Sequence, residues 1–274
     1  MMGKLYVVAT PIGNLKDITF RALEVLKSVD VIAAEDTRHI QKLLNHYGIY
    51  GKKLISYHDY NEEEKSEKLI EILKIQDVAL VSDAGTPCIS DPGYRIVKKA
   101  RENNIEVVPI PGAFAGAVAL SVSGLPSDKF LFVGFLPNKE TEREENLKHY
   151  IDIGFTFILY ESPKRVLKTL KTLEKVDPLA DVVVAKELTK IHESFFTGKP
   201  ENIIKFFEEN PDKLKGEFVI LVHPNKEKVV DMNLILTEAK QLKNHGMKTK
   251  EISSLLSQKY KVSKKEIYKK ILNL

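Results

Sequence analysis

Acidic, hydroxyl and small residues gather in one segment of the sequence, SDAGTPCISDPG at residues 82–93, directly after an apolar run. Asp83 stands where that run ends, and Gly85 lets a ligand approach the backbone. A carboxylate in this place can bind a ribose hydroxyl or an amine, whereas a phosphate site would need basic residues and several glycines. Asp91 and Pro92 are typical of a helix start, as cap and first helical residue. This segment is the strongest local signal of a binding site in the chain.

A second loop of interest is ATPIGNLKD at residues 9–17. Pro11 and Gly13 allow a tight turn that brings backbone N–H groups near a ligand. The loop lacks the glycines of a dinucleotide fingerprint, so it does not predict binding of a dinucleotide pyrophosphate. An ordinary turn between a strand and a helix explains it equally well.

A third loop, EDTRH at residues 35–39, also follows an apolar run. The density of polar groups there makes Asp36 and Arg38 candidates for a site, and we expect Thr37 to cap the following helix. The alternative is that Asp36 caps the helix and Arg38 is exposed. A fourth loop at residues 109–117 is rich in small residues, which let a helix start pack closely against a ligand.

The elements that must position these loops alternate between strands and helices. Near-continuous apolar runs predict strands buried on both faces of a parallel sheet, and amphipathic runs such as 20–28 predict the helices between them. The predicted strands of the first part are 5–9, 31–34, 54–57, 78–82 and 107–109. The turn cluster SGLPSD at 123–128 is the best candidate linker, and a second set of strands with hairpin-like spacing follows it. The fold class is therefore α/β, with a parallel sheet in a domain of residues 1–124 and a mixed sheet in a second domain, 125–225.

Residues 226–274 predict a third region made only of short helices. It holds twelve lysines and five acidic residues, a net charge of +7, although the whole chain carries +4. A mildly acidic body with a basic helical end suggests a polyanionic partner bound at that end. A solvated lysine-rich helical face is the alternative.

Composition excludes several classes of protein. The chain has 274 residues, 43% of them hydrophobic, which excludes intrinsic disorder. Cys88 is the single cysteine, so neither a disulfide nor a cysteine-based zinc or iron–sulfur site forms within one chain. No ligand cluster with metal spacing is present, and no metal is expected. No apolar run is long enough to span a membrane, and the first residues do not read as a secretory signal, so we expect a soluble cytoplasmic protein.

Eight motifs, in order and spacing, resemble the tetrapyrrole-methylase-like family of S-adenosylmethionine-dependent methyltransferases. They are ATPIGNLKDIT, AEDTR, SDAGTPCISDPG, IPGAFAGAVALSVSGLP, GFLPNK, YESPKR, AKELTKIHESFFTG and KGEFVILV. The later four resemble the branch that methylates the 2′-oxygen of a cytidine in 16S ribosomal RNA of the bacterial small subunit. Two departures are Phe114, where the family usually has serine, and Lys164, where it usually has histidine. The resemblance thins after about residue 225.

The resemblance implies two α/β domains that form a cleft for S-adenosyl-L-methionine. The residues expected to bind this cofactor are Pro11, Asp83, Ala84, Gly85, Ile89, Pro111, Gly112, Ala113, Tyr160 and Leu188. A ribose hydroxyl is a poor nucleophile at neutral pH and benefits from a base or a lysine. The candidates for that catalytic role are Lys186, Glu187, Glu161 and Asp36. A structural ion pair is the alternative for each charged pair among them.

The same resemblance implies a partner, 16S ribosomal RNA or the small ribosomal subunit. We also expect a homodimer, because two-domain enzymes that form a cleft often pair. The basic helical end favours an RNA substrate over a tetrapyrrole or another substrate of the same fold. A non-catalytic RNA-binding factor in ribosome assembly is the alternative from another class. A nicotinamide-dependent dehydrogenase is disfavoured because the glycine fingerprint is missing.

Overall fold

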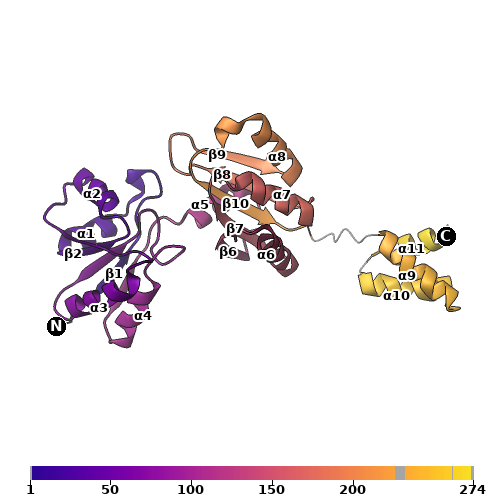
Figure 1. The fold of residues 1–274 in the computed structure, drawn as a ribbon, viewed down its shortest axis with the longest axis horizontal. Helices are drawn as coiled ribbons and strands as arrows, with labels where there is room; N and C mark the ends of the chain where they lie inside the picture. The colour runs from indigo at the N-terminus through magenta and orange to yellow at the C-terminus, as the bar shows by residue number, and fades with distance from the viewer. Residues whose placement is uncertain (1, 226–231, 261, 273–274) are drawn as a thin grey trace. The chain divides into compact units, whose positions relative to one another are not determined.

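The computed structural model of the chain describes residues 2–225, 232–260 and 262–272 (Figure 1). It divides into two compact units, Met1–Pro224 and Asn225–Leu274. The larger unit contains two five-stranded sheets, and the smaller one contains helices. The α/β fold class with terminal helices is thereby confirmed.

The first sheet is parallel throughout, with strand order β3-β2-β4-β1-β5. Its strands are β1 (Leu5–Val8), β2 (Val31–Ala34), β3 (Lys53–Ser56), β4 (Val78–Val81) and β5 (Val107–Ile110). All residues of β2 and β4 are buried, as their unbroken apolar sequence predicts, because helices cover both faces of the sheet. These helices are α1 (Phe20–Ser28), α2 (Thr37–His46), α3 (Glu62–Leu73) and α4 (Tyr94–Glu102), with a 3-10 turn at Leu15–Asp17.

The second sheet is mixed, with strand order β6-β7-β10-β8-β9. Its strands are β6 (Phe130–Phe135), β7 (Thr156–Glu161), β8 (Asp181–Lys186), β9 (Ser194–Gly198) and β10 (Phe218–His223). Only β6 and β7 pair in parallel. One face packs on α6 (Glu140–Ile153), α7 (Val166–Val176) and α8 (Pro200–Glu209), and the other on α5 (Ala115–Ser123). A 3-10 turn at Pro211–Lys213 follows α8.

The smaller unit consists of α9 (Met232–Asn244), α10 (Thr249–Tyr260) and α11 (Lys264–Leu272), in agreement with the helical region that the sequence predicts. They share their own apolar core, which contains Ile235, Ala239, Ile252, Leu256, Ile267 and Ile271. The predicted region also includes residues 226–231, 261, 273 and 274, which lie outside the described residues. Among the helices that the structure describes, none combines the length and apolar character needed to cross a membrane.

Two predicted helix starts were wrong. Asp36, not Thr37, caps α2, because its carboxylate accepts a hydrogen bond from the Arg38 N–H at 2.8 Å. Asp91 does not cap α4, which begins later, at Tyr94, after Gly93 with φ +139°. That conformation is open to glycine alone among ordinary residues, so the chain turns at Gly93 and leaves Asp91 in the preceding loop.

Candidate functional site

The loops that leave β1, β4 and β5 are fastened together at the carboxyl edge of the first sheet. Thr10 and Gly85 form a two-way bridge, in which each N–H donates to the other carbonyl at 2.8 and 3.0 Å. The Thr86 hydroxyl donates to the Ala113 carbonyl at 3.0 Å and ties in the loop after β5. Ligands of open α/β sheets bind in the crevice at this edge.

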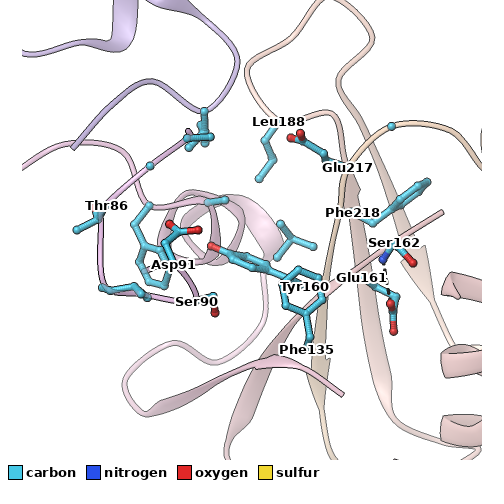
Figure 2. A pocket seen from close by; sticks show the side chains of 18 of the residues that line it. Thr86, Ser90, Asp91, Phe135, Tyr160, Glu161, Ser162, Leu188, Glu217 and Phe218 are labelled. Atoms are coloured by element: carbon cyan, nitrogen blue, oxygen red, sulfur yellow. Dashed lines mark hydrogen bonds between the residues drawn. The ribbon is translucent and has the colours of Figure 1, made fainter. Parts of the chain in front are cut away.

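A pocket of about 380 Å³ opens beside these loops (Figure 2). Its size lies within the range of small-molecule sites. The strand-end loops of the first sheet form one wall, and residues of the second sheet form the other. The lining residues are Ile12, Ala84, Gly85, Thr86, Ile89, Ser90, Asp91, Phe114, Ala115, Phe135, Tyr160, Glu161, Ser162, Pro163, Leu188, Gly216, Glu217, Phe218 and Val219.

Half of the residues expected to bind the cofactor line this pocket: Ala84, Gly85, Ile89, Tyr160 and Leu188. The other five lie in the same loops but not among the lining residues: Pro11, Asp83, Pro111, Gly112 and Ala113. Gly112 packs on the β1 end, since an added Cβ would lie 2.7 Å from the Ala9 Cβ. Asp83 accepts a hydrogen bond from the Asp36 N–H at 3.0 Å and so joins the loops after β2 and β4.

Of the four candidate catalytic residues, only Glu161 lines the pocket, and its carboxylate is held by neighbours. It accepts hydrogen bonds from the Ser162 N–H at 2.9 Å and the Thr169 hydroxyl at 2.7 Å. The Arg165 Nε lies 3.2 Å from it as well. Because its side chain is fully buried, these partners fix it in one position.

Lys186 and Asp36 lie outside the pocket lining. Lys186 is buried at the end of β8, on the same face of the strand as Val182 and Val184, which pack against α7 and α8. Asp36 forms an ion pair with Arg38 at 2.6 Å, and hydrogen bonds from this guanidinium hold the pKa of the carboxyl well below its usual range.

Glu187 lies outside the pocket lining and holds neighbouring segments of the pocket wall in place. Its carboxylate accepts hydrogen bonds from the Glu217 N–H and from Lys190 Nζ, both at 2.9 Å. Although burial opposes it, these bonds lower the pKa of Glu187, so the carboxylate is ionised at neutral pH and is a weak base. Lys190 also pairs with Glu217 at 3.0 Å, so one lysine joins the two segments that carry Leu188 and Glu217 into the pocket wall.

The segment 187–190 is held in a strained conformation. Glu187 has φ +52° and Thr189 has φ +64°, values that residues other than glycine seldom adopt. It packs directly on Gly13, where an added Cβ would lie 2.7 Å from Thr189 Oγ1 and 2.8 Å from the Leu188 carbonyl oxygen. Strain of this kind persists where surrounding contacts determine the backbone, and it concentrates at functional sites.

The most informative residue that sequence reasoning missed is Asp91. Burial, followed by repulsion from Glu35, raises its pKa to about 7, and Asp83 adds to the effect. The pKa of Glu35 is raised too, first by burial and then by Asp83. The repulsion that raises both pKa values shows that neighbouring carboxylates make the potential negative at this wall, which suits a cationic ligand. Burial raises the pKa of the Cys88 thiol to about 11, so this thiol stays protonated at neutral pH.

Comparison with known proteins agrees with this geometry. Residues 4–204 match the family model described as Tetrapyrrole (Corrin/Porphyrin) Methylases. The chain belongs to this family. It is therefore a methyltransferase, and S-adenosylmethionine is the methyl donor of the family. The positively charged sulfonium and amine of this cofactor fit the acidic wall at Asp91, where the charge of nearby Glu35 adds to the negative potential, and the apolar lining fits its uncharged parts.

Relatives match over the full length of the chain. The ribosomal RNA small subunit methyltransferase I of Pasteurella multocida is 42% identical over 271 residues, 98% of this chain and 96% of that protein. The protein of the same name from Escherichia coli O157:H7 is 44% identical and covers 97% and 94%. Among solved structures, a diphthine synthase has a TM-score of 0.63 at 20% identity, covering 81% of this chain and 90% of its own. At that identity the last comparison supports the fold alone.

We expect Gly13→Ala to displace the segment 187–190, because its Cβ would lie 2.6 Å from Lys190 Cγ and 2.8 Å from the Leu188 carbonyl oxygen. Leu188 would then leave its place in the pocket wall. Calorimetry should show at least about tenfold weaker binding of S-adenosylmethionine, with a free energy of unfolding lowered by roughly 1–3 kcal/mol.

The matched control for this variant is Gly48→Asn. Gly48 has φ +66° and open space around it, and asparagine tolerates that conformation. Affinity for the cofactor should stay at the wild-type value in the control. Unchanged affinity in Gly13→Ala as well would show that the contact does not shape the site.

Proposed function

We propose that this methyltransferase transfers a methyl group from S-adenosylmethionine to the 2′-oxygen of a cytidine in 16S ribosomal RNA of the small ribosomal subunit. The observation that carries the proposal is full-length identity of 42–44% to proteins named ribosomal RNA small subunit methyltransferase I. We also propose that the protein acts in the cytoplasm, where ribosomes are assembled. The tetrapyrrole and diphthine enzymes share the fold at 16–20% identity, which does not favour their substrates.

The same proposal assigns the cofactor to the pocket. Ala84, Gly85, Ile89, Tyr160 and Leu188 line it and are the residues we expect to contact S-adenosylmethionine. When bound, the cofactor supplies a methyl group on a positively charged sulfur, which is already a good leaving group. The task of the protein is then to exclude water and to align an oxygen nucleophile. Asp83 maintains the acidic wall through its bond to the Asp36 N–H and through its charge.

The direct test is to map 2′-O-methylation on 16S ribosomal RNA from cells with and without the gene, and to restore the gene as wild type or as Asp83→Asn. The wild type should restore one methylated cytidine. Asp83→Asn retains an oxygen that can accept a hydrogen bond from the Asp36 N–H, but it lacks the negative charge. We therefore expect at least about tenfold weaker cofactor binding and reduced methylation.

Two outcomes would contradict the proposal. A methylation map that is unchanged by loss of the gene would exclude the RNA substrate. Failure of the purified protein to bind S-adenosylmethionine would favour the non-catalytic assembly factor. Asp83→Asn with wild-type affinity would remove Asp83 from the cofactor site without affecting the assignment of the substrate.

The homodimer is part of the proposal, and exposed apolar residues on the larger unit support it. Val122 of α5 is 63% exposed and Phe130 of β6 is 42% exposed, and β6 is an edge strand of its sheet. Uncovered apolar side chains beside an edge strand are typical of an interface. Sedimentation should give the mass of two chains, and Val122→Asp should reduce it to one. A wild-type chain that sediments as a monomer would contradict the dimer.

We further propose that the smaller unit docks the RNA. The lysines of its described residues are exposed, and among those residues only Lys259 forms an ion pair, with Glu238 at 2.6 Å. With the apolar side chains gathered in the helical core, the lysines are free to neutralise phosphates. Aromatic side chains for base stacking are few here, so we expect this unit to position the RNA without reading its sequence.

The test of docking replaces Lys264, Lys265, Lys269 and Lys270 with glutamine in the full chain. RNA affinity should fall, and its dependence on salt should flatten by about 0.7–0.9 per lost phosphate contact. The control replaces the exposed Lys42, Lys53, Lys168 and Lys205 of the larger unit, none of which is in an ion pair with another described residue. Equal effects of the two sets would show general attraction to charge and no docking by the smaller unit.

A further inference from the structure

Three carboxylates line the pocket, and they differ in their partners. Glu161 lies 3.2 Å from Arg165 Nε, and Glu217 lies 3.0 Å from Lys190 Nζ. Asp91 has no basic side chain within 4.0 Å among the residues that the structure describes. Within the described part of the chain it is therefore the pocket carboxylate that lacks a cationic partner.

The loop that carries Asp91 is fixed by a buried network beneath it. Glu62 Oε1 accepts hydrogen bonds from the Gly93 N–H at 3.0 Å and from the Arg95 N–H at 3.2 Å. The same oxygen accepts a bond from the Tyr57 hydroxyl at 3.0 Å, and Tyr57 is almost fully buried. These bonds set the backbone directly after Asp91.

The backbone before Asp91 is strained. Cys88 has φ +70° and Ser90 has φ +65°, and Gly93 leaves no room for a Cβ, which would lie 2.5 Å from Cys88 Sγ. A simple turn between β4 and α4 needs none of these features. Strained residues held by a buried network are typical of groups that must be placed accurately in a site.

Asp91 faces Tyr160 across the pocket. Figure 2 shows its carboxylate and the Tyr160 hydroxyl turned toward the same space. Burial raises the pKa of Tyr160 to about 12, and the charge of Asp91 adds to this, against a backbone hydrogen bond at Gly116. Tyr160 therefore keeps its proton at neutral pH and can donate a hydrogen bond, while Asp91 can accept a proton.

We propose that Asp91 is the general base that removes the proton of the substrate hydroxyl during methyl transfer, an inference that rests on the proposed function. The hydroxyl O–H bond breaks and the proton passes to an Asp91 carboxylate oxygen. The substrate oxygen forms a bond to the methyl carbon, and the methyl–sulfur bond breaks with its electron pair retained by sulfur. Asp91 then releases the proton to water.

The environment of Asp91 suits this role. Glu35 and Asp83 lie in the neighbouring loops, Asp59 follows β3, and the Ser82 hydroxyl donates a hydrogen bond that partly offsets their repulsion. The resulting pKa of about 7 is close to neutral pH, where a general base is most effective. By contrast, Glu187 has a lowered pKa and lies outside the lining.

The experiment compares Asp91→Asn with the wild type on 16S ribosomal RNA, using the full-length protein. We expect kcat at saturating cofactor to fall by about 10²–10⁴-fold, the usual contribution of a general base. For the wild type, kcat/KM should rise with pH through one ionisation near pH 7. This rising limb of the pH profile should be absent in the variant. The matched control is Asp59→Asn, which removes a repelling charge outside the pocket lining and should move the limb to lower pH.

Two readouts besides activity separate a base from a charge that only binds the cofactor. Calorimetry should show that Asp91→Asn lowers the affinity for S-adenosylmethionine by at most about tenfold, because the variant removes one charge of the acidic wall, and that it leaves the affinity for the uncharged sulfur of S-adenosylhomocysteine closer to wild type. A selective loss of S-adenosylmethionine binding with unchanged kcat at saturation would overturn the proposal. Because the folded state raises the pKa of Asp91 from 3.8, the aspartate lowers stability progressively as pH rises from about 4 to 7. Asp91→Asn should therefore unfold no more easily than wild type at pH 8.

Failure of this inference is distinguishable from failure of the proposed function. If the wild type does not methylate 16S ribosomal RNA, the substrate assignment is wrong. If the wild type methylates it and Asp91→Asn does so with the same kcat and the same pH profile, Asp91 is not the base.

Discussion

The site depends on one constraint of the first sheet: β1 lies between β4 and β5, and all three strands run parallel. Their carboxyl ends therefore meet at one edge, and the loops that leave them are neighbours although they are far apart in the sequence. The bridge between Thr10 and Gly85 is made by main-chain atoms. Close approach of backbone to backbone explains why small residues are placed where the loops touch.

The carboxylates around the pocket divide into two kinds. Glu161, Glu187 and Asp36 accept hydrogen bonds from nearby N–H groups or pair with cations, and these contacts fix neighbouring segments. For Glu35 and Asp91, burial and repulsion from neighbouring carboxylates outweigh the hydrogen bonds that they accept, so the pKa of each is raised. The first kind builds the walls, and the second gives one wall its negative potential.

The helical unit at the end of the chain is organised separately from the sheets. Its buried aliphatic residues come from all three helices, and its lysines lie outside that core. The exposed positive charge of these lysines thus belongs to the smaller unit and the acidic wall of the pocket to the larger one. Positive charge attracts polyanions over a distance, whereas an acidic wall repels phosphates. One chain can therefore provide both environments.

The sequence by itself determined the elements and the loops, because apolar runs and amphipathic periods report burial directly. It also indicated Ala84, Gly85, Ile89, Tyr160 and Leu188 as pocket residues, because they belong to motifs that resemble those of the family, four of them in loops and Tyr160 near the end of β7. Only the tertiary structure placed Asp91 in the pocket. Locally, an aspartate before a proline is typical of a helix cap. In the structure, the Gly93 N–H instead donates to the carboxylate of Glu62 in α3, which is distant in the sequence, and the helix begins at Tyr94. The partners of Glu161 and Glu187 were equally hidden, because strand register and packing decide which donors reach a buried carboxylate.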